Sequence, residues 1–109
     1  MLDFSTDLPR LPAQKSVVIG TTGNVVEVKI DSRVGRISFQ PIGADAKLSL
    51  DSGLADGEAI GSAEYSTLNA DTWWYNSAQR ELLSGCAQVT SYFVTAASGT
   101  RIEVFVEAS

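Results

Sequence analysis

The fold class is decided by the stretch Arg36-Ile-Ser-Phe-Gln-Pro-Ile-Gly-Ala-Asp-Ala-Lys-Leu-Ser-Leu50. Apolar and polar residues alternate in its first half and again in its second half, and a period of two is typical of a strand with one buried face. Pro41 should end the first strand because proline has no N–H to donate to a neighbouring strand. Gly43 lies at the corner between the two halves, where the chain must turn. The stretch therefore predicts two short strands joined by a tight corner.

The same alternation recurs along most of the chain. It predicts further strands at 17–19, 24–30, 64–68, 72–75, 88–96 and 100–107. The first two of these are separated by Thr21, Thr22 and Gly23, which predicts a hairpin between them. Only 77–84 has a pattern that suits a short helical turn. About eight short strands at close spacing, without a strand–helix–strand unit, predict an all-β antiparallel β-sandwich or jelly-roll-like domain.

The segment Met1 to Gln14 differs from the rest of the chain. It contains two separated prolines, which disfavour a helix or a central strand. Its apolar residues are isolated anchors: Leu2, Phe4, Leu8 and Leu11. We therefore expect residues 1–14 to form an extended N-terminal arm and residues 15–109 to form a single β-sandwich domain. Such an arm can add a strand to the sheet edge of a neighbouring subunit, and an ordinary fraying terminus is the alternative.

The composition excludes several classes of protein. The chain has no histidine and Cys86 is its only cysteine, which rules out intramolecular disulfides, Cys/His zinc sites and histidine-dependent catalysis. The 13 acidic and 8 basic residues give a net charge of −5, the wrong sign for a nucleic-acid partner. No apolar run approaches the roughly twenty residues that cross a bilayer, and residues 1–16 lack the basic start of a secretion signal. We therefore expect a soluble protein made in a reducing cytosol, with neither a membrane nor a nucleic acid as partner.

Carboxylates are the remaining candidates for chemistry. Pairs for acid–base work on a sugar are available from Asp51, Asp56, Glu58, Glu64 and Asp71. With 13 acids in 109 residues such pairs are unavoidable, so we expect no catalysis. The loop 51–58 also groups carboxylates as a calcium site does, but it lacks the alternate ligand spacing of an EF-hand loop. A solvated acidic loop is the simpler interpretation, and no metal ligand is assigned.

The densest aromatic cluster is Trp73-Trp74-Tyr75. In a strand, Trp73 and Tyr75 share one face and Trp74 takes the other. One face should belong to the core. The other would offer a sugar-stacking platform or an anchor for a protein partner, because Trp and Tyr supply much contact area at little ordering cost.

A second group of residues falls opposite the obvious apolar face of its strands, and it comprises Val25, Trp74, Tyr92 and Phe105. If these side chains share a face they form an exposed apolar patch, which marks a subunit or partner interface. A core covered on both sides is the alternative explanation. Together with the arm, this reasoning predicts an interface made of Leu2, Phe4, Leu8, Leu11, Trp74, Tyr92 and Phe105.

Three stretches carry a resemblance to a known group of proteins. They are the stretch 36–50 quoted above, Tyr65-Ser-Thr-Leu-Asn-Ala-Asp-Thr-Trp-Trp-Tyr-Asn76 and Gly99-Thr-Arg-Ile-Glu-Val-Phe-Val-Glu107. In this order they resemble small β-sandwich accessory proteins encoded among the structural genes of tailed bacteriophages. The resemblance implies a capsid decoration or cement protein, a head-fibre base or a small tail piece, located in the virion and without enzymatic activity or cofactor. It also implies a phage capsid or other virion protein as partner, and a homo-oligomer, with a trimer favoured because capsids offer threefold sites.

Two functions of other classes stay open beside this expectation. One is a carbohydrate-binding β-sandwich module that uses Trp73, Trp74 or Tyr75 as its aromatic platform, with a glycan as partner. The other is a small enzyme that depends on a pair of carboxylates.

Overall fold

The computed structural model describes residues 1–4, 11–31, 33–51, 53–77 and 90–108. These residues contain no helix and form a β-sandwich, which confirms the predicted fold class. Their nine strands are β1 (Leu2–Asp3), β2 (Ala13–Val18), β3 (Val26–Ile30), β4 (Val34–Ile42), β5 (Ala46–Ser49), β6 (Ser66–Leu68), β7 (Trp74–Ser77), β8 (Thr90–Ala96) and β9 (Arg101–Ala108). Every strand expected from the alternation is present with shifted bounds, and β1 is an addition. Of the expected helical turn at 77–84, Ser77 belongs to β7 and the rest lies outside the described residues.

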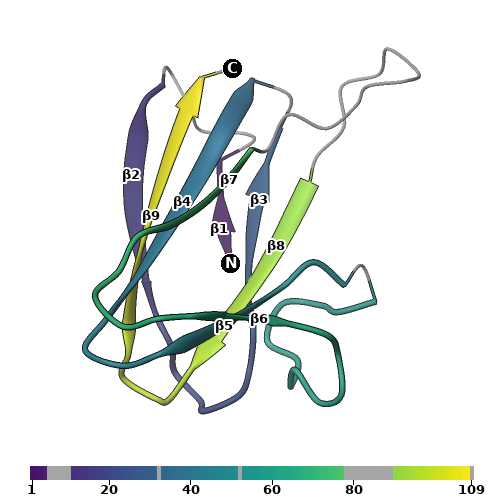
Figure 1. Ribbon diagram of the computed structural model, residues 1–109. Coiled ribbons are helices and arrows are strands. Elements are labelled where there is room, and N and C mark those ends of the chain that lie inside the picture. The colour runs from purple at the N-terminus through teal and green to yellow at the C-terminus, as the bar shows by residue number, and fades with distance from the viewer. Residues whose placement is uncertain (5–10, 32, 52, 78–89, 109) are drawn as a thin grey trace.

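The strands form two sheets that pack face to face (Figure 1). One sheet has the order β1-β3-β8-β5-β6, and the other has the order β2-β9-β4-β7. All neighbouring strands run antiparallel except β1 and β3, which run parallel. β8 and β9 follow one another in the chain but lie in the interior of different sheets, so the turn between them crosses the sandwich.

The predicted hairpin between residues 17–19 and 24–30 is wrong. β2 pairs with β9 over its whole length, and β3 belongs to the other sheet. Between them, Ile19 joins the β8–β9 turn: its N–H donates to the Thr100 carbonyl at 3.0 Å, and its carbonyl accepts from the Gly99 N–H at 2.7 Å. Polar residues and a glycine mark a change of direction, but they do not say whether the chain returns to the same sheet.

Pro41 does not end β4 as predicted. The strand continues to Ile42, and Pro41 lies opposite Ile102 of β9. The Pro41 carbonyl accepts a hydrogen bond of 2.7 Å from the N–H of Asp71, away from β9. Because the N–H and C=O of one residue point to the same side of a strand, the missing N–H also faces away from β9. The proline therefore removes no bond from the β4–β9 ladder.

The core between the sheets contains a chain of three aromatic side chains. Phe39 contacts both Trp74 and Tyr92, with ring centroids 6.1 and 5.8 Å apart and tilted ring planes, as aromatic pairs prefer. Tyr92 has no exposed surface, and Trp74 is half-buried against the core. The prediction that these two side chains lie on an exposed patch is therefore wrong, because both point toward the opposite sheet.

The outer face of the β1-β3-β8-β5-β6 sheet is covered by the loop that follows β5. Val25 and Phe93 belong to a second apolar cluster with Ile60 of this loop, and they are only 1% and 4% exposed. The Val25 N–H donates to Glu58, and the Val25 carbonyl accepts from Gly57, both at 2.8 Å. Val25 is therefore no part of a surface patch, and the alternative of a strand buried on both sides applies to β8.

The predicted arm packs on its own domain wherever it is described. Leu2 and Asp3 form β1 at the edge of β3, and Phe4 lies in the core with no exposed surface. Leu11 packs against the same core, and the last two residues of the predicted arm already belong to β2. Leu8 lies outside the described residues.

Candidate functional site

A row of side chains crosses the outer side of the β2-β9-β4-β7 sheet. The register places Gln14 opposite Phe105, Phe105 opposite Ser38, and Ser38 opposite Tyr75. Cross-strand partners lie on the same face of a sheet, so these side chains form one line. Trp73, directly before β7, lines the same shallow depression of about 400 Å³. We call Trp73, Tyr75 and Phe105 the aromatic face.

The aromatic face presents large apolar side chains to solvent. Tyr75 is 63% exposed and Trp73 is 44% exposed, while Phe105 is half-buried in the middle of the row. The alternation of β7 produces this arrangement, because Trp74 between them turns inward onto Phe39. A partner that covers these rings gains contact area at little conformational cost.

Arg36 restrains the aromatic face from one side. Its guanidinium carbon lies 5.0 Å from the ring centroid of Tyr75, and its Nε donates a hydrogen bond of 2.9 Å to Oε1 of Glu107. Arg36 and Glu107 are direct partners across β4 and β9. Because the ion pair is well exposed, it contributes only about 0–1 kcal/mol to stability. Its effect is to hold the charged and aromatic groups in place before a partner arrives, which lowers the ordering cost of binding.

The side chains that line this depression offer aromatic rings, an amide, a hydroxyl and two charged groups. Of the described residues that line it, Glu107 alone carries a carboxylate, and Arg36 already engages that group. Acid–base hydrolysis of a sugar requires two carboxylates across the scissile bond. Aromatic rings in the centre with amide, hydroxyl and charged groups around them suit recognition instead.

Comparisons with family models, curated proteins and solved structures find no match. The aromatic face and its surroundings are therefore the basis for a functional proposal.

The residues that the sequence predicted for an interface are scattered by the fold wherever the structure describes them, which leaves out Leu8. Phe105 alone among them belongs to the aromatic face. Phe4 and Tyr92 have no exposed surface, and Leu2, Leu11 and Trp74 pack against the core. Trp73 and Tyr75 lie on one side and Trp74 on the other, as the sequence predicted.

Sequence reasoning missed the polar members of the site, namely Gln14, Arg36, Ser38 and Glu107. Arg36, Ser38 and Glu107 occupy polar positions of alternating strands, which marks them as outward-facing, whereas Gln14 fell in the predicted arm and carried no such signal. Bringing the four together requires the order β2-β9-β4, and alternation within a strand carries no information about which strands are its neighbours.

The acidic loop has its carboxylates turned toward backbone N–H groups. Asp56 accepts from the N–H of Glu27, and Asp51 accepts from the N–H of Gly53, both at 2.8 Å. Within the described ranges, no group of three acidic or cysteine side chains is placed to hold a metal ion. The same ranges contain no helix that is long and apolar enough to span a membrane.

Proposed function

We propose that this chain is a structural virion protein of a tailed phage, a capsid decoration or cement protein that binds the shell and self-associates. The observation that carries the binding role is the aromatic face, where two exposed rings and a pre-formed ion pair stand on a sheet. The virion context rests on the resemblance of the three sequence stretches.

The aromatic face has the composition of a protein contact. Trp, Tyr and Arg are the side chains that contribute most to binding in protein interfaces, and Trp73, Tyr75 and Arg36 lie together here. Gln14 and Ser38 supply polar groups between and beside the rings. A shell presents its contact sites many times, so a modest single contact gives strong attachment when the bound copies are also linked to one another.

Mass spectrometry of purified phage particles tests the virion context. We expect the chain in the particles at a fixed ratio to the major capsid protein. Its absence from particles whose other structural proteins are all detected would end the proposal.

Substitutions in the aromatic face test the contact itself. Trp73→Ala and Tyr75→Ala should each weaken binding to particles that lack the protein by about 30-fold, the size of a hot-spot loss. Tyr65→Ala is the matched control, because Tyr65 is 48% exposed but lies beside β5 and β6 of the other sheet. Binding that is lowered equally by all three changes would contradict a specific role for the aromatic face.

A carbohydrate-binding module is the second candidate. It is favoured by the exposure of Trp73 and Tyr75 on one side, since such rings stack on the apolar face of a sugar while Gln14, Arg36 and Glu107 can hydrogen-bond its hydroxyls. A glycan array with the wild type and the Tyr75→Ala variant separates the two functions. Selective glycan binding that Tyr75→Ala abolishes supports this candidate, and the absence of any glycan binding removes it.

A further inference from the structure

The edge of β3 is closed by two segments from distant parts of the chain. At its start, the Glu27 N–H donates to Asp56 of the acidic loop at 2.8 Å. Beyond this point β1 takes over, with Leu2 opposite Val28 and Asp3 opposite Lys29. The Phe4 N–H then donates to the Lys29 carbonyl at 2.8 Å. Residues 2–4 thus complete an edge that is otherwise only partly paired.

Phe4 is the side chain that secures this segment. It has no exposed surface and belongs to the main core, while the ammonium of Lys15, from the other sheet, lies 5.6 Å from its ring centroid. Leu2 packs against the same core, whereas Asp3 and Lys29, the next residues of β1 and β3, lie on the outer face of the sheet. We call the space along the edge of β3 that residues 2–4 occupy the slot. The slot therefore accepts an extended segment with an apolar residue first and an aromatic residue two positions later.

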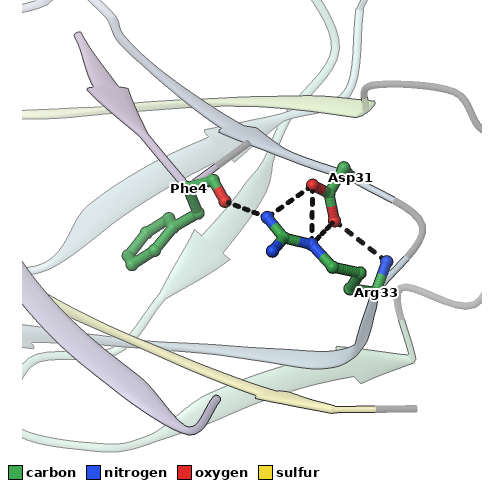
Figure 2. A network of polar contacts seen from close by, with 3 residues as sticks. All are labelled: Phe4, Asp31 and Arg33. Atoms are coloured by element: carbon green, nitrogen blue, oxygen red, sulfur yellow. Dashed lines mark hydrogen bonds and ion pairs between the residues drawn. The ribbon is translucent and has the colours of Figure 1, made fainter. Parts of the chain in front are cut away.

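Figure 2 shows the polar contacts of Phe4, Asp31 and Arg33 at the far end of the slot. Asp31 holds the guanidinium of Arg33 through contacts of 2.7 Å at Nη2 and 3.0 Å at Nε. In this position Nη2 also reaches the carbonyl oxygen of Phe4 at 3.5 Å, a long hydrogen bond. The Asp31–Arg33 pair thus offers a donor to whichever segment fills the slot.

We propose that the slot is filled in trans when copies of this chain assemble, so that residues 2–4 of one copy complete β3 of the next. This inference deepens the self-association in the proposed function and rests on it. The occupant we propose is residues 2–4 of a second copy, because this segment fits the slot within one chain and is present in every copy. The contacts are the same in both arrangements, and only the tether differs.

The balance between the two arrangements is set by concentration. A segment tethered to its own slot has an effective concentration in the millimolar range, so dilute protein keeps it in place. Copies held side by side on a shell reach similar local concentrations, and exchange then links them. Each copy gives one segment and receives one, and such a contact closes into a ring when the rotation between copies allows it, as in a trimer. The seven residue steps from Phe4 to Leu11 span at most about 25 Å, which limits exchange to adjacent copies.

The test uses two full-length variants that can form a disulfide only after exchange. One carries Asp3→Cys and the other carries Lys29→Cys, and both carry Cys86→Ser. Asp3 and Lys29 are paired across neighbouring strands, whose spacing of about 4.8 Å lies within the range that a disulfide spans. The two chains are unfolded together, refolded at about 1 mM each and oxidised. A Val18→Cys chain in place of the Lys29→Cys chain reports random collision, because Val18 is 61% exposed and lies on β2.

We expect the Asp3→Cys and Lys29→Cys chains to give about tenfold more disulfide-linked heterodimer than the collision control, with less at micromolar concentration. Adding Phe4→Ala to the Asp3→Cys chain should remove most of this product, since the segment then lacks its buried anchor. A yield equal to that of the control in a sample that light scattering shows to be oligomeric overturns the exchange. That result leaves self-association standing, so the two proposals fail separately.

Discussion

Asp31 makes the stability of the fold depend on pH. Hydrogen bonds from the Arg33 side chain lower the pKa of Asp31 below its ordinary value of 3.8, against the opposing effect of partial burial. Because the folded state releases this proton more readily than the unfolded state, Asp31 stabilises the fold above pH 3.8. The contribution is lost as the pH falls through the lower pKa of the folded state.

The Asp31→Asn variant isolates this contribution. We expect it to be less stable than the wild type at about pH 7, and the difference in unfolding free energy should shrink as the pH falls to about 2. Urea denaturation at both pH values measures the difference. Arg33→Met should remove the same pH dependence, because it takes away the partner that lowers the pKa. A difference that is equal at both pH values would contradict this account.

Phe4 should contribute more to stability than any exposed aromatic residue. Replacing a fully buried phenylalanine by alanine costs about 3–5 kcal/mol, from lost burial and from the cavity left behind. Tyr75→Ala, at a site 63% exposed, should change the unfolding free energy by only about 0.5 kcal/mol. Urea denaturation of both variants gives the comparison. A cost below about 1 kcal/mol for Phe4→Ala would mean that residues 1–4 are loosely held.

At the scale of single strands, the sequence predicts where a strand occurs better than which of its faces points to the core. All strands that show a contrast between polar and apolar positions were predictable, as in β9, where Ile102, Val104 and Val106 are buried. The face of β7 that points to the core was not predictable, because Trp73 and Trp74 are both apolar and either could face the core. In β8 the loop after β5 buries the second face, so Tyr92 and Phe93 look alike in the sequence and lie in different clusters.

Lys15 lies on β2, an edge strand, and its charge there should oppose pairing with another sheet. It lies opposite Val104, whose side chain is buried, so Lys15 stands on the inner face of the edge strand β2. An inward-facing charge on an edge strand opposes pairing with another sheet, because pairing would bury the charge. Lys15→Ile should therefore leave the fold stable and promote aggregation that light scattering detects. Lys47→Ile is the matched control, since Lys47 is exposed on β5, which is paired on both sides. Equal aggregation of the two variants would contradict the edge role.

At the scale of the molecule, the last two strands of the chain hold both sheets together. β8 lies between β3 and β5, and β9 lies between β2 and β4. Without them, the described pairings that survive are the short ones of β1 with β3, β5 with β6, and β4 with β7. No local pattern announces this dependence, which is why strand order was the part of the fold that the sequence did not reveal. The same strand order brings Arg36, Tyr75 and Phe105 together, so local sequence patterns did not reveal the candidate site either.

A chain that ends at residue 89 should consequently remain unfolded. It keeps the strands up to β7, but each surviving pair of strands is too small to be stable in water by itself. Far-UV circular dichroism and limited proteolysis of the truncated chain, with the full chain as control, measure the outcome. Adding a peptide of residues 90–109 at high concentration should restore a β spectrum, because it supplies the interior strand of each sheet. Protease-resistant structure in the truncated chain alone would show that a subset of strands folds independently, and would contradict a single cooperative sandwich.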